Sequence, residues 1–267
     1  MDRKIFKTLD KFRKVPLIIK TALLIFAVLS LYTGIQGYRA ATRVLAELND
    51  QYRSNDSLMV RMVQSDPLFD RIMTEKWLQT QLRLSALDSI ILYINLRDSS
   101  ISLVLKGVTV FDQPLESFGY SKILNKMNRS AKVSLLSNPL MVTSDTASIP
   151  KANYRTVKAP KNEEEASLLT TQILPDTIRE EVTARLLLEN GMTILLEQGQ
   201  QKISHDSRSY RKFLSDQRTK TWLFLCKDLL SLKIPDYHPW IKIYLPGEEV
   251  KNIYRALPGN AMVVLMI

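Results

Sequence analysis

The sequence IILYINLRDSSISLVLKGVTVF, residues 90–111, contains three short runs of branched and aromatic side chains. Such runs are typical of β-strands, and the pair Lys106-Gly107 supplies a turn between the second run and the third. The pattern therefore predicts a β-meander. Its strands are expected at residues 90–96, 101–105 and 108–111.

Further elements are predicted on the C-terminal side of this meander. Asn190-Gly191, a pair favoured in tight primed turns, predicts a hairpin of residues 185–189 and 192–197. Ile241–Leu245 alternates as a strand does, and the turn Pro246-Gly247 follows it. The last elements expected are a helix over Glu248–Ala256 with Val250, Ile253 and Tyr254 inward, and an apolar strand over Ala261–Ile267.

Three intervening stretches have weaker patterns. Residues 134–166 lack sustained periodicity, which predicts a long excursion or two short elements joined by loops. Pro175-Asp176 precedes a helix predicted over Thr177–Ala184. Tyr210–Leu232 has helical spacing, although Trp222–Cys226 within it fits a buried strand equally well.

The N-terminal part is predicted to anchor the chain in a membrane. Residues 21–38, TALLIFAVLSLYTGIQGY, carry no charge and reach about 27 Å as a helix, close to the thickness of a hydrocarbon core. Residues 1–20 form a basic segment with seven basic and two acidic side chains, so the N-terminus is expected in the cytoplasm. The chain is then a single-pass protein of the bacterial inner (cytoplasmic) membrane with its domain in the periplasm. The alternative is a signal that is cleaved near Ala40.

Residues 39–87, between the anchor and a domain at 88–267, are predicted to be helical. Their apolar side chains recur at three- and four-residue steps, and Asp66-Pro67 starts a new helix. The favoured interpretation is a stalk, and the alternative is a short coiled coil that makes a homo-oligomer. The expected fold class is α+β, with a transmembrane helix and helical stalk followed by a β-rich mixed domain.

The composition argues against several classes of function. Of the formal net charge of +10, the basic segment supplies +5, and the rest is spread with both signs interspersed, so nucleic acid is not an expected partner. Cys226 is the only cysteine, which excludes an intrachain disulfide and a cysteine metal cluster. The sequence has no phosphate-binding loop, dinucleotide fingerprint or zinc spacing, and neither a cofactor nor a metal is expected.

Two stretches resemble the catalytic domain of the L,D-transpeptidases, the YkuD-type family. That family opens with a strand of the type I-x-V-D-L, an x-Gly turn and P-V-S-x-G, and Tyr93–Leu96, Lys106-Gly107 and Pro114–Gly119 occupy these places. It ends with S-x-G-C-[IV]-R-M, an acidic residue, a Leu-Tyr pair and G-T-x-V. The matching positions are Ile241–Ile243, Glu248-Glu249, Ile253-Tyr254, Leu257–Asn260 and Val263-Val264.

The family's catalytic residues are missing from the matching positions. In the family a cysteine thiolate attacks the donor peptide, the histidine of a His-Gly motif activates it, and the arginine of the motif supports the site without a cofactor. Here the Gly-Cys pair is Pro239-Trp240, the arginine is Lys242, and the sequence has no His-Gly pair. A nucleophile and its base act as a unit, so the resemblance implies a noncatalytic domain, a pseudoenzyme with no catalytic residue.

The residues around the former active-site strand are the candidate binding site. They are Tyr237, His238, Trp240, Lys242 and Tyr244. Burial in the core is the favoured interpretation of the three aromatic side chains, with Trp240 as a plug in the vacated cleft. The alternative is a stacking surface for sugars or peptides. His238 is interpreted as structural, with ligand binding as its alternative.

Three hypotheses about function follow. The leading one is a domain that binds peptidoglycan stem peptides or an envelope protein partner without processing them. The first alternative is a divergent acyl transferase with Cys226 as a relocated nucleophile, although apolar neighbours disfavour a reactive thiolate. The second is a structural subunit of a larger membrane complex. Ser204, His205 and Asp206 are not interpreted as a triad, because triad residues converge in space rather than in sequence.

The anchor interpretation predicts that the native protein keeps its N-terminus. It should fractionate with membranes, and protease should reach residues after Arg39 only from the outer side. N-terminal sequencing and protease protection measure both points. A mature chain that starts near Ala40 or Ala41 in the soluble periplasmic fraction would contradict the prediction.

Overall fold

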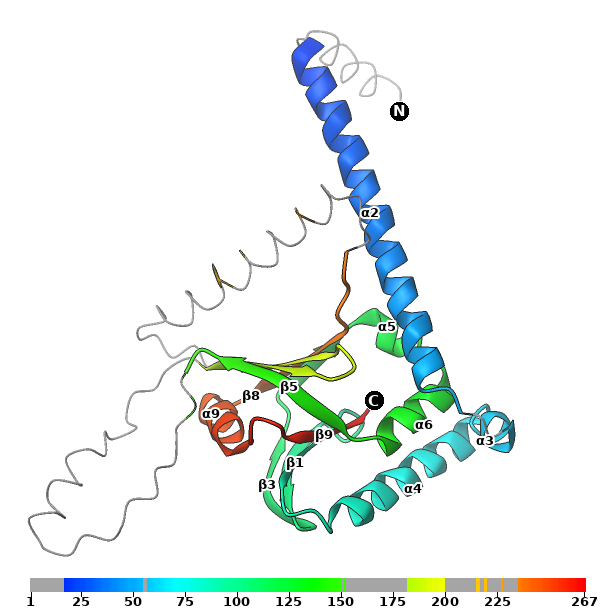
Figure 1. Cartoon of the computed structure of the whole chain (residues 1–267), viewed down its shortest axis with the longest axis vertical. Helices are drawn as coiled ribbons and strands as arrows, with labels where there is room; N and C mark the ends of the chain where they lie inside the picture. Colours follow the sequence, from blue (N-terminus) through cyan, green and yellow to red (C-terminus); the bar gives the residue numbers. More distant parts are fainter. Residues whose placement is uncertain are drawn as a thin grey trace, which may run out of the picture. The chain divides into compact units, whose positions relative to one another are not determined.

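The computed structural model describes residues 17–54, 57–149, 151, 182–199, 215–216, 219, 227 and 235–267 (Figure 1). The chain forms two compact units. The first comprises Met1–Val44 and Trp222–Tyr237, and the second comprises Leu45–Thr221 and His238–Ile267. The fold is α+β, as expected, with an apolar N-terminal helix and a large mixed sheet.

Helix α2, Leu17–Gln51, contains the whole predicted membrane segment. Its apolar side chains are exposed, with Leu24 66% and Phe26 71% accessible. Exposed apolar surface of this extent is unfavourable in water but not in lipid. By length and composition, α2 is the one helix in the described part of the chain that can cross a membrane.

Two further helices complete the region predicted to be helical. They are α3, Ser57–Met62, and α4, Asp66–Leu84, which begins at the expected Asp-Pro pair. Proline suits the first turn of a helix because the amide hydrogen it lacks has no partner there. The prediction of a mainly helical region is therefore confirmed, with α2, α3 and α4 covering most of the described residues from 39 to 84.

Helix α4 belongs to the domain and is not a free stalk. Met73, Thr80 and Leu84 are buried, and Trp77 packs edge-on against Tyr93 of the sheet with ring centroids 5.3 Å apart. The Thr80 hydroxyl donates to the Leu136 carbonyl at 3.3 Å. These apolar side chains of α4 share a core with Ile91 and Tyr93, so α4 packs on the predicted domain although it precedes residue 88.

Among the described residues, nine strands form one sheet in the order β3-β2-β1-β9-β5-β6-β7-β8-β4. Of the strand pairs in this part of the chain, only β1–β9 and β7–β8 are parallel. The strands are β1 Ile90–Asn95, β2 Ser100–Leu105, β3 Val108–Pro114, β4 Ser117–Tyr120, β5 Leu140–Ala147, β6 Thr183–Leu188, β7 Thr193–Gln198, β8 Trp240–Leu245 and β9 Met262–Met266. The remaining helices are α5 Lys122–Asn125, α6 Arg129–Ser137 and α9 Gly247–Ala256. The predicted meander and the predicted C-terminal strand–helix–strand are confirmed.

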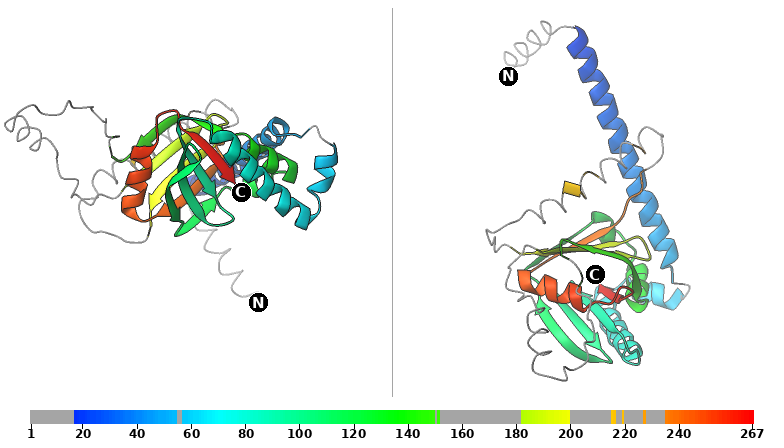
Figure 2. Two further views of the ribbon diagram at one scale, coloured as in Figure 1. Left: turned by 90° about the horizontal axis from the view of Figure 1, so that it is seen from below. Right: turned by 60° about the vertical axis from the view of Figure 1, so that its left-hand side comes forward.

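The sheet curls so that its two edges meet at one corner (Figure 2). β3 and β4 lie at opposite ends of the strand order, yet only Leu115 and Glu116 separate them in the chain. The Leu115 N–H donates to the Ser99 carbonyl at 2.8 Å, and the Glu116 N–H donates to the Tyr244 carbonyl at 3.0 Å. This link ties the β2 side of the sheet directly to β8.

The strand β1 is buried on both faces. Ile91 and Tyr93 join a core with α4 and α6, and Leu92 and Ile94 are also fully buried on the opposite face. A strand covered on both faces has an almost continuous apolar sequence, which explains the lack of polar alternation in its sequence. On α9, Val250, Ile253 and Tyr254 are buried, as predicted.

The turn at Asn190-Gly191 differs from the prediction. Lys106 and Gly107 both have positive φ, 52° and 77°, as a two-residue primed turn requires, whereas at 190–191 only Gly191 does, at 78°. A three-residue loop results, closed by the Leu188 N–H to the Met192 carbonyl at 2.8 Å. The Asn190 side chain accepts from the Met192 N–H at 3.1 Å, so a local hydrogen bond stabilises the wider turn.

Three weaker predictions have mixed outcomes. The helix predicted over Thr177–Ala184 is wrong at its end, because Thr183 and Ala184 lie in β6, and residues 177–181 are outside the described residues. In 210–232, positions 215–216, 219 and 227 are helical, and the others are outside the described residues. In 134–166, the end of α6 and β5 form two short elements, and residues 150 and 152–166 are again outside.

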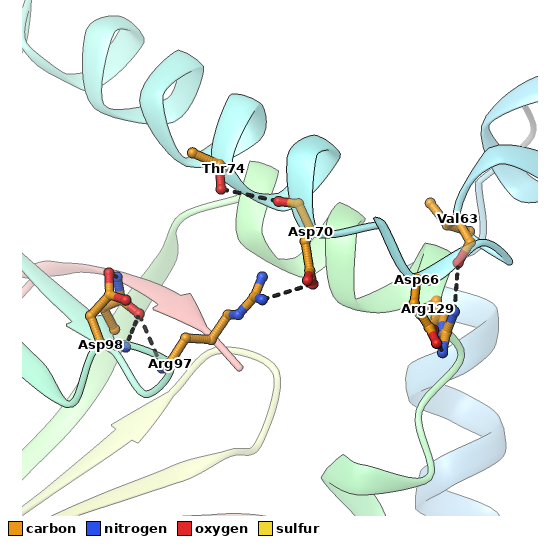
Figure 3. A network of polar contacts seen from close by, with 8 residues as sticks. Val63, Asp66, Asp70, Thr74, Arg97, Asp98 and Arg129 are labelled. Carbon is orange, nitrogen blue, oxygen red and sulfur yellow. Dashed lines mark hydrogen bonds and ion pairs between the residues drawn. The ribbon is translucent and has the colours of Figure 1, made fainter. Parts of the chain in front are cut away.

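Arginine side chains connect the helical region to the domain (Figure 3). Arg97 pairs with Asp70 of α4 at 2.7 Å. Arg129 of α6 pairs with Asp66 and donates to the Val63 carbonyl at 3.3 Å. These groups are exposed, so each ion pair stabilises the fold by about 1 kcal/mol at most, and the apolar contacts of α4 contribute more.

Replacing Tyr93 by Phe should leave the domain as stable or more stable at neutral pH. The side chain is 1% exposed, and its hydroxyl has no hydrogen-bond partner among the described residues. The Tyr93→Phe variant therefore removes a desolvated polar group without losing a bond, and the free energy of unfolding should rise by up to about 1 kcal/mol. Denaturant unfolding measures this change, and a loss above about 1 kcal/mol would contradict it.

The same variant has an expected signature at alkaline pH. Burial raises the pKa of Tyr93 to about 12, with the Arg83 charge opposing the shift. The folded state therefore holds this proton more tightly than the unfolded state, and its contribution to stability is lost as pH rises from 10 through 12. The decline, about 1.4 kcal/mol per pH unit for this group, should be absent from the Tyr93→Phe variant.

Candidate functional site

The candidate site lies on the face of β8 that points away from the core. Ile241, Ile243 and Leu245 are fully buried, whereas Trp240, Lys242 and Tyr244 alternate with them and retain exposure. Successive side chains of a strand point to opposite faces, so the three apolar residues fix the outward direction of the other three. We call Trp240, Lys242 and Tyr244 the β8 strip.

Trp240 is not a plug of the core. It is 38% exposed, and the prediction of a buried indole is wrong because the residue has the outward parity of the strand. Its ring lies over Gly119 of β4, where an added Cβ would be 3.8 Å from the indole Cζ3. With no side chain at Gly119, the indole rests against a flat strip of backbone.

Lys242 is held by neighbours on both sides. Its Nζ is 2.8 Å from Glu197 Oε2 on β7 and 5.2 Å from the ring centroid of Tyr244. Burial alone would lower the pKa of Lys242, but the contacts with Glu197 and Tyr244 outweigh it and raise the pKa. The ammonium group is therefore a fixed positive charge beside an aromatic ring.

The other two predicted site residues have different places. The His238 Nδ1 is 3.1 Å from the Gly191 carbonyl, to which it donates a hydrogen bond when it carries a proton. This contact ties the start of β8 to the β6–β7 turn and supports the structural interpretation of His238. Tyr237 belongs to the first compact unit, where it is half-buried.

The backbone at Pro239-Trp240 offers no free donor for an oxyanion. Proline has no N–H, and the Trp240 N–H donates to Ser121 Oγ at 2.9 Å. The Pro239 carbonyl accepts from the Thr193 N–H at 2.8 Å. This segment is thus fully engaged in joining β8 to its neighbours β4 and β7.

Other candidate chemistry finds no support in the described part of the chain. No group of three or more His, Cys, Asp or Glu residues that could hold a metal ion occurs there. Cys226 and His205 both lie outside the described residues. What the β8 strip can do chemically is stack, pair and donate hydrogen bonds, which are functions of binding.

Three residues of the site were not predicted from sequence. Glu197 lies on β7, and Gly119 and Ser121 lie in and just after β4, so the three residues come from two segments that meet β8 through strand pairing. Glu197 stands opposite Tyr244 in the parallel β7–β8 register, and Gly119 stands opposite Lys242. β7 ends at residue 198 and its parallel partner β8 begins at residue 240, so no local sequence pattern indicates that they pair. Only the fold identifies these residues.

Comparison of the chain with protein-family models, curated proteins and solved structures finds no significant match. The resemblance to L,D-transpeptidases therefore stays a sequence-based prediction.

Replacing Trp240 by Ala should cost little stability. A partly exposed indole on the outer face leaves no cavity, so the free energy of unfolding should fall by about 1 kcal/mol or less, as for surface substitutions. Ile243→Ala, in the same strand but fully buried, is the matched control and should lose about 2 to 5 kcal/mol. Denaturant unfolding of both variants makes the comparison, and equal losses would contradict it.

Proposed function

We propose that this chain is a membrane-anchored protein of the bacterial cell envelope whose transpeptidase-like domain binds peptides without processing them. The peptide class proposed is the stem peptide of peptidoglycan. The observation that carries the proposal is the β8 strip, where Trp240, Lys242 and Tyr244 occupy the outer face of the strand that resembles the family's active-site strand. The length and apolar composition of α2 support the anchor, and the basic segment before it supports a periplasmic location of the domain.

An extended peptide fits this surface because β4 is the last strand of the sheet. Among the described residues β4 pairs only with β8, so its other edge can accept a further strand through backbone hydrogen bonds. A peptide added there would lie beside Gly119, next to the exposed indole.

Binding without chemistry is supported by the same geometry. Trp240 stands where the family has its thiolate, and its N–H is already bound to Ser121. Lys242, in the place of the arginine, is paired with Glu197. The positions that resemble the family's thiolate and arginine are thus occupied by residues with other partners, and the sequence has no His-Gly pair to supply the base. A nucleophile and its base act together, so their joint loss removes the reaction.

The proposal predicts that the full-length protein in detergent will cosediment with isolated cell-wall sacculi. Trp240→Ala should weaken this binding about ten-fold or more, because a stacking residue at the centre of a site contributes over about 1 kcal/mol. Val110→Ala is the matched control, since Val110 is an exposed apolar side chain on the opposite edge strand β3, 56% accessible. Unchanged cosedimentation of Trp240→Ala would contradict the assignment of the site.

Two further measurements separate this function from its alternatives. A carbapenem-type β-lactam acylates an active thiol, so intact mass should show no adduct on the wild-type protein. An adduct that disappears in Cys226→Ala would establish the acyl transferase instead. Failure to bind sacculi, together with recovery of a stoichiometric protein partner from detergent extracts, would establish the structural subunit.

A further inference from the structure

The surface formed by α5 and the start of α6 has an uncompensated positive charge. Residues 117–144 contain Lys122, Lys126, Arg129 and Lys132 and no acidic residue. Arg129 pairs with Asp66, but Lys122 and Lys126 are exposed and have no ion-pair partner in the described ranges. Lys122 is on α5, Lys126 directly follows it and Lys132 is on α6, and we call these three residues together the α5 lysines.

Lys132 adds to this charge from a half-buried position. Its own burial lowers its pKa, and repulsion by the neighbouring Arg129 lowers it further. Both causes disfavour the charged form of Lys132, and a nearby negative group would stabilise that form. Lys132 therefore attracts an anion to this surface together with the two exposed lysines.

The surface adjoins the end of α2. The Asn128 N–H, between α5 and α6, donates to Asn49 Oδ1 in the last turn of α2 at 2.9 Å. Asn190 Nδ2, from the β6–β7 turn, donates to the hydroxyl of Tyr52 just after α2, at 3.2 Å. Asn49 lies eleven residues after Tyr38, the last residue of the apolar run. In a helix this separation corresponds to about 17 Å along the axis.

That distance is comparable with the distance over which a lipid surface attracts opposite charge. The headgroup layer extends about 5 to 7 Å beyond the hydrocarbon core, and charge acts over a further 8 Å or so at physiological ionic strength. A lysine side chain covers the rest. Because α2 also tethers the domain, the local concentration of headgroups is high, and weak attraction is enough to hold the contact.

We propose that the α5 lysines bind the phosphate groups of anionic phospholipids in the leaflet from which α2 emerges. The occupant is the membrane itself, since its charge complements the surface and the helix that crosses it ends in contact with the same segment. Lysine suits this role because it meets phosphate as a mobile point charge without a fixed geometry. The surface is separate from the β8 strip.

Amine acylation of the full-length protein in nanodiscs tests the proposal. One nanodisc contains only phosphatidylcholine and the other contains about one-third phosphatidylglycerol, and mass spectrometry follows each lysine. Lys122 and Lys126 should react several-fold more slowly in the anionic nanodisc at low salt, and the difference should vanish at high salt. Lys106, 60% exposed and paired with Asp88 on the β2–β3 turn, is the internal control and should not change.

A second measurement uses a dye on α5. Asn125→Cys, exposed between the two lysines, is labelled in a Cys226→Ser background, and quenching by a headgroup-labelled lipid is recorded. Lys122→Gln combined with Lys126→Gln should reduce the quenching in anionic nanodiscs to its value in phosphatidylcholine. Equal acylation in both nanodiscs, or quenching that the double substitution does not change, would overturn the proposal while leaving sacculus binding unaffected.

Discussion

The pairing of β9 with β1 is the interaction on which the rest of the domain depends. β9 inserts between β1 and β5, so the last strand of the described sheet joins the β1–β2–β3 meander to the strands β5–β6–β7–β8–β4. Val263 and Leu265 face one core, Val264 and Met266 face the other, and all four are buried. Because this strand contacts both cores and pairs on both edges, the sheet can close only when its final residues are present, and such distant pairing forms late in folding.

The junction between the helical region and the sheet depends on that closure. The core beneath α4 contains Val264 and Met266 of β9 together with Met73 and Tyr93, so α4 has its full binding surface only after β9 is in place. The ion pairs on the outside of α4 are exposed and contribute little. A helix held by apolar contacts along one face acts as a part of the domain, and its end moves with the sheet.

Sequence patterns predicted most of the elements and the inward face of α9, but they did not predict that Trp240 faces outward. The run at Ile90 is recognisable because both faces of β1 are buried, and Lys106-Gly107 is recognisable because its turn requires positive φ at both positions. Trp240 was assigned to the core because aromatic residues are usually buried. Yet its strand alternates Ile241, Ile243 and Leu245 with Trp240, Lys242 and Tyr244, and this parity places the indole on the outer face. Glu197 and Gly119 depend on pairing across long stretches of chain and have no local pattern.

The alternation that exposes the β8 strip favours the binding function that we propose over catalysis. Catalysis at this strand would need a thiolate, a nearby base and a free backbone donor in one geometry. In the structure, the Trp240 N–H donates a hydrogen bond to Ser121, and the Lys242 ammonium forms an ion pair with Glu197. A stacking surface needs only an outward aromatic side chain beside a residue with a small side chain or none. Strand parity turns Trp240 outward, and the β4–β8 pairing places Gly119 beside it. A binding surface therefore needs only a suitable shape and charge on this face. The residues that provide them also hold β4, β7 and β8 together.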